Sequence, residues 1–80
     1  MTVTVLLFAS YADALGRSTI ELDLAIGATV KDMIDRVRGM ASAERLPPAP
    51  LVAVNERYAS PDRELRPGDE VALIPPVAGG

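Results

Sequence analysis

The chain has 80 residues, of which 49% are hydrophobic and 24% charged, and its formal net charge is −3. This length allows one domain with a small core, and the composition is typical of a folded globular protein. The eight basic side chains are scattered and outnumbered by eleven acidic ones, which argues against binding to nucleic acid or to an anionic membrane. No apolar run approaches the roughly 18 residues that span a bilayer, and Met1–Thr4 lacks the basic start of a signal peptide, so we expect a cytoplasmic protein.

Cysteine and histidine are both absent from the chain. Without cysteine the protein has no disulfide, no iron–sulfur cluster and no thiol nucleophile, and without histidine most zinc sites and catalytic triads are excluded too. We therefore expect no metal site and no conventional catalysis by side chains.

Two segments near the N-terminus alternate between apolar and polar residues, as half-buried strands do. The first strand is predicted over Thr2–Phe8. The short segment Ala9–Leu15 and a turn at Gly16 then lead to a second strand, predicted over Ser18–Leu24. The side chains expected to face the core are Val3, Val5, Leu7, Ile20, Leu22 and Leu24.

A helix is predicted after Thr29, whose hydroxyl can cap it while Asp32 at the third helical position completes an arrangement close to a capping box. The helix is expected to end near Gly39 or Met40, with Asp32 and Arg36 on its exposed side. Its apolar stripe consists of Val30, Met33, Ile34 and Val37.

The second half of the chain begins with a loop over Ala41–Pro50, which contains three prolines. Asn55-Glu56 is expected to form a turn, Leu65 to be the single apolar anchor of a turn-rich segment, and Asp69 to shape the turn before the last strand, leaving Glu70 exposed. The strands predicted in this half are Leu51–Val54, Arg57–Ala59 and Glu70–Ile74.

Two strands, a helix and further strands in fewer than 80 residues are the order of the β-grasp fold, an α+β fold in which a mixed sheet curls round one main helix. A ferredoxin-like βαββαβ arrangement is the competing fold. It needs a second helix, and the interval Ser60–Pro67 is too short and too rich in turns to supply one. We therefore expect one domain over residues 1–74, followed by a flexible tail over residues 75–80.

The tail begins with Pro75-Pro76, which cannot donate to a sheet and favours an extended course. The six residues from Pro75 to Gly80 can reach on the order of 20 Å beyond the sheet. Gly79 and Gly80 have no side chains, so the terminal carboxylate can pass through a narrow channel into another protein's active site. Two terminal glycines alone are a weak motif, because they can also be a frayed end.

A carboxylate is ionised at neutral pH and is a poor electrophile until it becomes a mixed anhydride with a phosphate. The chain has no Gly-x-x-x-x-Gly-Lys loop, so ATP would be bound by a partner enzyme and this chain would bind no cofactor of its own. An adenylated Gly80 can accept sulfur to become a thiocarboxylate, which would let a cysteine-free protein carry reactive sulfur.

The segment Gly68–Gly80 resembles the C-terminal signature of the molybdopterin synthase small subunit, a family of sulfur carriers with a ubiquitin-like β-grasp fold. The step Val54-Asn55, Leu65 and the opening Val5–Ala9 are similar to that family too, so the likeness covers almost the whole chain. Leu73, Ile74 and Ala78 depart from it, since the family commonly has aromatic residues in the last strand and threonine before the glycines.

The resemblance implies that an adenylyltransferase related to ubiquitin-activating enzymes forms a glycyl adenylate on Gly80, and that a sulfur donor converts it to the thiocarboxylate. The tail would then enter the large subunit of a heterotetrameric synthase, where sulfur passes to cyclic pyranopterin monophosphate in molybdenum cofactor biosynthesis. The catalytic side chains are expected on the large subunit. The residues expected to thread into the partner are Pro75, Pro76, Val77, Ala78 and Gly79.

An apolar patch formed by Leu6, Phe8 and Ile74 on the open face of the sheet is the candidate surface for docking the large subunit or the activating enzyme. Core packing or isolated surface exposure of these three residues is the competing interpretation. Tyr11 and Tyr58 could stack at an interface, but a partly buried tyrosine is more often structural, so neither is assigned to the patch.

Three other functions remain open from the sequence. The chain can be a sulfur carrier of the same fold for thiamine, cysteine or transfer-RNA thiolation. It can be a ubiquitin-like modifier, joined through Gly80 to lysines of other proteins. It can also be an interaction module with an inert tail.

Overall fold

A computed structural model describes residues 1–40 and 50–75 of the chain. Most of the loop predicted over Ala41–Pro50, and the tail from residue 76 to Gly80, lie outside the described residues. The described elements are β1 (Thr2–Leu7), α1 (Ser10–Leu15), β2 (Thr19–Asp23), α2 (Val30–Arg38), β3 (Leu51–Val54), β4 (Arg57–Tyr58) and β5 (Glu70–Ile74).

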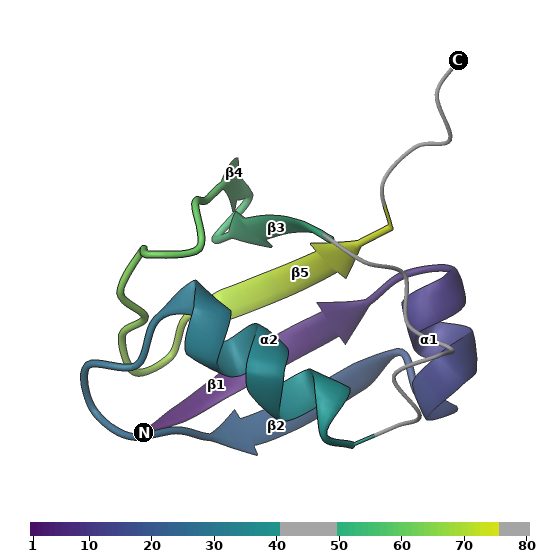
Figure 1. Cartoon of the computed structure of the whole chain (residues 1–80), viewed down its shortest axis with the longest axis horizontal. Coiled ribbons are helices and arrows are strands. Elements are labelled where there is room, and N and C mark those ends of the chain that lie inside the picture. The colour runs from purple at the N-terminus through teal and green to yellow at the C-terminus, as the bar shows by residue number, and fades with distance from the viewer. Residues whose placement is uncertain (41–49, 76–80) are drawn as a thin grey trace.

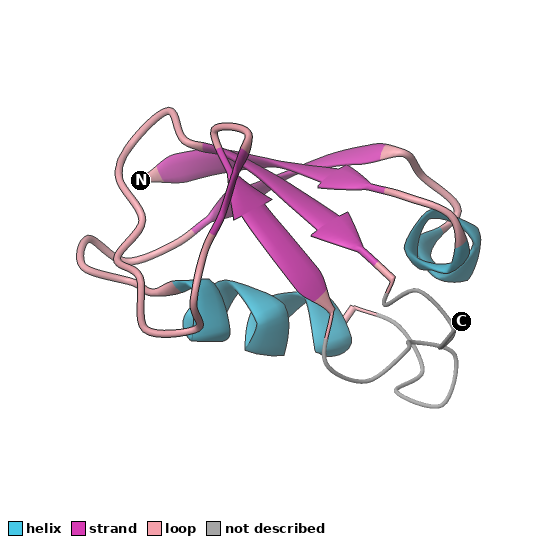
Figure 2. Cartoon of the chain, turned by 90° about the horizontal axis from the view of Figure 1, so that it is seen from above, coloured by secondary structure: helices cyan, strands magenta, loops and turns pink. Residues whose placement is uncertain are grey.

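The strands form one mixed sheet in the order β2-β1-β5-β3-β4. β1 and β5 are parallel, and the other neighbouring pairs are antiparallel. Figure 1 shows α2 lying across one face of this sheet, and Figure 2 shows the strands curling over the helix. This arrangement confirms the predicted β-grasp fold, and it makes β5, which leads into the tail, the central strand.

The core fills the space between the sheet and α2. Both residues of β4 are exposed, whereas every second side chain of β1, β2, β3 and β5 is buried, as predicted for the first two strands. Met33 of α2 is fully buried against them, and Leu65 is 1% exposed, which confirms its role as an apolar anchor. No helix among residues 1–40 and 50–75 is long and apolar enough to cross a membrane.

The segment between the first two strands was expected only to connect them, but it forms the six-residue helix α1. Its C-terminus is closed by Gly16, which adopts the left-handed conformation and donates its N–H to the carbonyl oxygen of Ala12 at 2.8 Å. Tyr11, 2% exposed, anchors the helix in the core and is structural as expected. A helix this short depends on such packing, so periodicity alone does not reveal it.

The capping box predicted for α2 is confirmed. The Thr29 hydroxyl accepts the Asp32 N–H at 3.3 Å, and the Asp32 carboxylate accepts the Thr29 N–H at 2.9 Å. The carboxylate also accepts the Thr29 hydroxyl at 3.1 Å, and the two bonds that it accepts, from the Thr29 N–H and from the Thr29 hydroxyl, lower the pKa of Asp32. Asp32 is therefore committed to the cap and not to Arg36, whose Nη1 donates to the carbonyl oxygen of Asp23 at 3.2 Å. This bond ties α2 to the end of β2.

Candidate functional site

The tail leaves the sheet at its centre. Ile74, the last residue of β5, is paired with Leu51 of β3, and the half-buried Pro75 follows. The Phe8 N–H donates to the carbonyl oxygen of Leu73 at 3.3 Å, so the residue after β1 lies beside the end of β5. Gly80 and the rest of the tail are outside the described residues, and their roles stay predictions.

The face of the sheet opposite α2 is apolar near this exit. The register places Leu6, Ala72, Ala53 and Tyr58 in one row across β1, β5, β3 and β4. Residues paired across strands share a face, and the neighbours of Leu6, Ala72 and Ala53 along their strands are buried, so these three side chains point outward with Tyr58. Figure 2 shows α2 on the other side and α1 beyond the end of the strands, so neither helix covers this face.

Ile74 and Leu51 form a second row, next to the point where the tail leaves. Leu51 is 39% exposed and Ile74 half-buried. We call the two rows together the tail-side apolar face, which consists of Leu6, Leu51, Ala53, Tyr58, Ala72 and Ile74.

The three residues predicted to form a docking patch are brought to the same region. Leu6 and Ile74 lie on the tail-side apolar face, and Phe8, 47% exposed, lies at its edge just past β1. None of them is in the core, which removes core packing as an explanation for these residues. Their role in docking stays a prediction.

Four residues of this face were not in the predicted patch, namely Ala53, Ala72 and the two larger ones, Leu51 and Tyr58. Tyr58 was left unassigned, with a structural role favoured over one at an interface, but it is 76% exposed and lies beside Ala53. Leu51 belongs to a strand of four consecutive apolar residues, Leu51–Val54, in which alternation gives no signal. The hairpin between β3 and β4 was the available clue, because its register places Tyr58 on the outer face.

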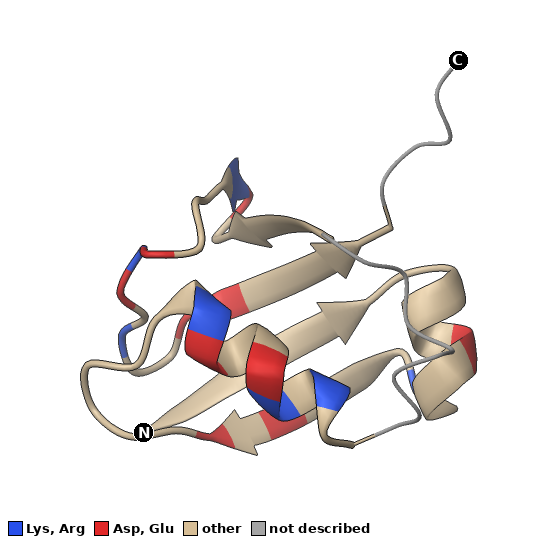
Figure 3. Cartoon of the chain, in the orientation of Figure 1, with Lys and Arg blue, Asp and Glu red and all other residues tan. Residues whose placement is uncertain are grey.

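Away from the tail the same face becomes polar. Thr4 of β1 is paired with Glu21 of β2 and with Glu70 of β5, and Glu70 is exposed as predicted. Figure 3 shows acidic residues at the start of β5 and along β2. The outer face therefore has an apolar end next to the tail and an acidic end far from it.

The backbone conformation of Ala9 turns the chain sharply after Phe8. Ala9 has φ 49° and ψ −121°, a conformation that costs a residue with a side chain on the order of 1–3 kcal/mol. The turn is held by two hydrogen bonds, from the Tyr11 N–H to the carbonyl oxygen of Phe8 and from the Asp13 N–H to that of Ala9, both at 3.0 Å. The strain thus accompanies the placement of an exposed aromatic ring beside the tail exit.

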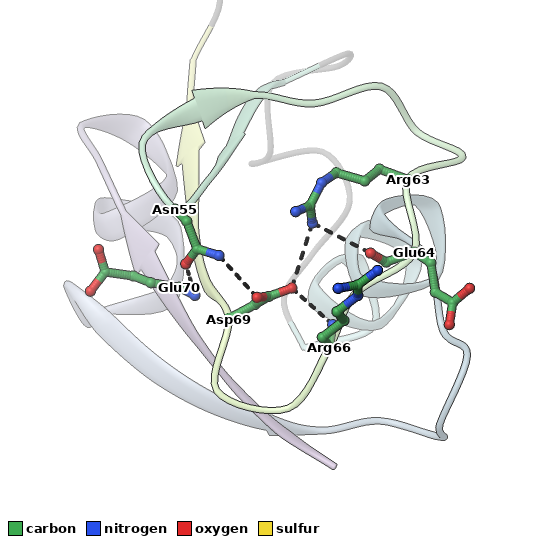
Figure 4. A network of polar contacts seen from close by, with 6 residues as sticks. All are labelled: Asn55, Arg63, Glu64, Arg66, Asp69 and Glu70. Carbon is green, nitrogen blue, oxygen red and sulfur yellow. Dashed lines mark hydrogen bonds and ion pairs between the residues drawn. The ribbon is translucent and has the colours of Figure 1, made fainter.

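A buried carboxylate holds the other end of β5 (Figure 4). Asp69, 8% exposed, accepts hydrogen bonds from Asn55 Nδ2 at 2.9 Å and from the Arg66 N–H at 2.8 Å, and lies 3.5 Å from Arg63 Nη1. Burial alone would raise the pKa of Asp69, but the bonds from Arg66 and Asn55 and the charge of Arg63 hold it below its ordinary value. The prediction that Asp69 shapes the turn is confirmed.

Asn55 connects this carboxylate to the hairpin that carries Tyr58. Its side-chain oxygen accepts the Glu70 N–H at 3.0 Å, and its own N–H donates to the carbonyl oxygen of Glu70 at 2.8 Å. Asn55 and Glu56 both have positive φ, 49° and 72°, as a tight hairpin turn requires, which confirms the predicted turn. The Asp69–Asn55 pair therefore fixes β4 relative to β5, and so positions one end of the tail-side apolar face.

Within the part of the chain that the structure describes, no three acidic, histidine or cysteine side chains are grouped so as to hold a metal ion. The described chemistry of the site is that of an apolar surface beside a chain exit.

Comparison with known proteins gives likenesses over almost the full chain. The ThiS family model matches residues 5–80. The molybdopterin synthase sulfur carrier subunit of Chlamydomonas reinhardtii is 34% identical over 83 residues, covering 100% of both chains. That of Dictyostelium discoideum is 32% identical over 80 residues, covering 95% of this chain and 93% of the relative.

Solved structures share the fold. Small archaeal modifier protein 1 of Haloferax volcanii is 30% identical with a TM-score of 0.84, covering 95% of this chain and 98% of its own. The ubiquitin of Caldiarchaeum subterraneum, at 24% identity and a TM-score of 0.68, covers 100% and 98%. A chain from the complex of subunits 1 and 2 of the molybdopterin-converting factor of Helicobacter pylori matches at 20% identity with a TM-score of 0.71, covering 100% of both chains. These two likenesses concern the fold, whereas the family match over residues 5–80 shows that the chain belongs to the ThiS family.

Proposed function

We propose that this chain is the sulfur carrier subunit of a molybdopterin synthase, and that the Gly80 carboxylate carries the sulfur. The observation that supports this most is that the ThiS family match continues through the tail to Gly80, in a chain whose matched relatives are molybdopterin synthase sulfur carrier subunits. The fold adds that the tail is a direct continuation of the central strand, beside an uncovered apolar surface.

The proposed cycle has two activating steps, both on a partner. In an adenylyltransferase the Gly80 carboxylate oxygen attacks the α-phosphate of ATP, which forms the glycyl adenylate and releases pyrophosphate. A donor then supplies sulfur at the sulfide level, which attacks the glycyl carbonyl carbon; the carbon–sulfur bond forms, the bond to the phosphate oxygen breaks, and AMP leaves, so that Gly80 ends in a thiocarboxylate. The chain's own contribution is reach and access, since six residues from Pro75 extend on the order of 20 Å and the last two have no side chains. We expect this cycle to take place in the cytoplasm.

The tail, with the thiocarboxylate on Gly80, would then enter the large subunit, which supplies the catalytic side chains and binds cyclic pyranopterin monophosphate. We assign docking to the tail-side apolar face, with Phe8 at its edge. Burial of such a surface contributes about 25 cal/mol per Å² of apolar area, and aromatic anchors such as Tyr58 and Phe8 commonly dominate such interfaces. Because the tail-side apolar face lies next to the tail exit, the tail can extend directly into a partner that is bound on this face.

A second candidate is protein modification, in which the activated Gly80 forms an amide with lysines of other proteins. The observation that favours it is the likeness to small archaeal modifier protein 1, at 30% identity over nearly the whole chain. A sulfur carrier for another pathway, such as thiamine, cysteine or transfer-RNA thiolation, would use the same Gly80 thiocarboxylate.

The test is to incubate the protein with its activating enzyme, ATP and a sulfur donor, and to measure its intact mass. The expected result is replacement of one oxygen atom by sulfur, located at Gly80 by fragmentation. The charged protein with a large subunit should then convert the pterin precursor to molybdopterin. An unchanged mass under conditions that charge a related carrier would overturn the proposal, and adducts on lysines of other proteins would favour the modifier.

A further inference from the structure

Lys31 is the only lysine among the 80 residues, while the other seven basic residues are arginines. Guanidinium groups stay protonated and are not acyl acceptors, whereas a lysine amine is. The chain therefore has two groups that an activated carboxyl carbon can acylate to an amide, the Lys31 side chain and the N-terminal amine.

The N-terminal amine is occupied in the structure. Met1 packs against the core, and its amine donates to the carbonyl oxygen of Leu24 at 2.7 Å and lies 4.0 Å from Asp23 Oδ1. The side chain of Met1 is 1% exposed. An incoming acyl group would have to break this contact between β1 and the end of β2.

Lys31 has the opposite surroundings. It is in the first turn of α2, its side chain is 70% exposed, and its Nζ lies 3.1 Å from Asp35 Oδ2, itself 60% exposed. The backbone is held, because the Lys31 N–H donates to the carbonyl oxygen of Pro61 at 2.9 Å. An exposed ion pair of this kind is weak, so the backbone of Lys31 is fixed while its amine can leave Asp35 and react.

Lys31 is in α2, on the opposite side of the sheet from the tail-side apolar face. α2 packs on the inner face of the sheet, whereas the tail-side apolar face is on the outer one (Figure 2). α2 also begins near the start of β5, while the tail leaves from the end of β5 (Figure 1). A partner enzyme docked on the outer face would leave Lys31 uncovered and accessible to the activated Gly80 of a second copy.

We propose that Lys31 is an acylation site of this chain, and that it accepts the activated Gly80 of a second copy. The inference rests on the proposed activation of Gly80. In the step, Lys31 Nζ loses a proton and attacks the carbonyl carbon of the glycyl adenylate; the amide bond forms, the bond to the phosphate oxygen breaks, AMP leaves, and a second proton is released. ATP, cleaved to AMP and pyrophosphate, supplies the driving force. Because there is one lysine, every junction between copies has the same linkage.

The experiment uses the full chain with its activating enzyme and ATP, in the absence of sulfur donor, and follows adenylation by exchange of pyrophosphate into ATP. An equal mixture of unlabelled and ¹⁵N-labelled copies should yield a covalent dimer whose mass is that of two chains less one water, with mixed-label dimer present. Fragmentation should give a branched peptide that joins Gly80 to Lys31. K31R, which keeps the charge beside Asp35, should show unchanged exchange and no dimer.

The matched control is the double variant K31R/R17K, in which the single lysine of the chain is moved from position 31 to the exposed position 17. The inference requires this variant to form much less dimer than the natural chain. Exchange without dimer, dimer that persists in K31R, or equal dimer from R17K would each overturn it while leaving the proposed function standing. Absence of exchange would overturn the proposed function, and this inference with it.

Discussion

Replacing Asp69 by asparagine tests whether the buried carboxylate holds β5 and the β3–β4 hairpin together. The carboxylate accepts bonds from Asn55 Nδ2 and from the Arg66 N–H. An amide has one acceptor oxygen, so its NH₂ group would face one of these donors. The loss of one bond to a charged group costs about 2 kcal/mol, which for a domain of this size lowers Tm by roughly 8–16 °C at neutral pH.

The pH dependence gives this prediction a second, independent readout. The pKa of Asp69 is lowered in the folded state, so its contribution is fully present above the unfolded pKa of about 3.9 and is lost as the pH falls through the folded pKa. The Tm difference between the natural protein and D69N should therefore shrink as the pH is lowered toward 3. Asp32 and Asp62 also have lowered pKa values, but they titrate in both proteins and cancel in the difference.

Calorimetry or circular dichroism between pH 7 and pH 3 provides the measurement. E70Q is the matched control, because Glu70 is the adjacent carboxylate but is exposed, and it should change Tm by no more than about 2 °C. A D69N protein with the natural Tm at pH 7, or one whose deficit is the same at pH 3, would refute the reasoning.

Three other predictions follow from the site. Deleting Gly80 should abolish charging with sulfur in the intact-mass assay while changing Tm by less than about 2 °C, because the described sheet ends at Ile74; a large fall in Tm would show that the tail is structural. Tyr58→Ala should weaken binding to the large subunit by about tenfold or more in calorimetric titration, with little change in Tm since the ring is 76% exposed; unchanged affinity would remove Tyr58 from the interface. Ala9→Gly should raise the free energy of unfolding by about 1 kcal/mol by relieving the strained conformation, as measured by urea denaturation, and a decrease would contradict the strain.

Local patterns in the sequence are enough to predict most of this fold. Alternation places Val3, Val5 and Leu7 in the core, and the spacing of Thr29 and Asp32 marks the start of α2. These features are decided within a few residues of the chain, by side-chain direction and by the first unpaired N–H groups of a helix.

Features that depend on strand pairing could not be predicted in this way. Leu51 and Tyr58 join Leu6 on one surface only because β5 lies between β1 and β3, and nothing near any of the three reveals that order. The helix α1 was not predicted for a related reason, since its stability depends on Tyr11, which packs into a core formed by segments distant in the sequence. The candidate patch was therefore found in part, and its extent required the structure.

The central place of β5 has a mechanical consequence. Its residues are paired on one side with β1 over Glu70–Leu73 and on the other with β3 over Val71–Ile74. A pull on the tail acts along the strand and loads both ladders at once in shear, instead of opening their bonds one after another as peeling an edge strand would. The domain should therefore resist a pull on its C-terminus better than it would if the last strand lay at the edge of the sheet.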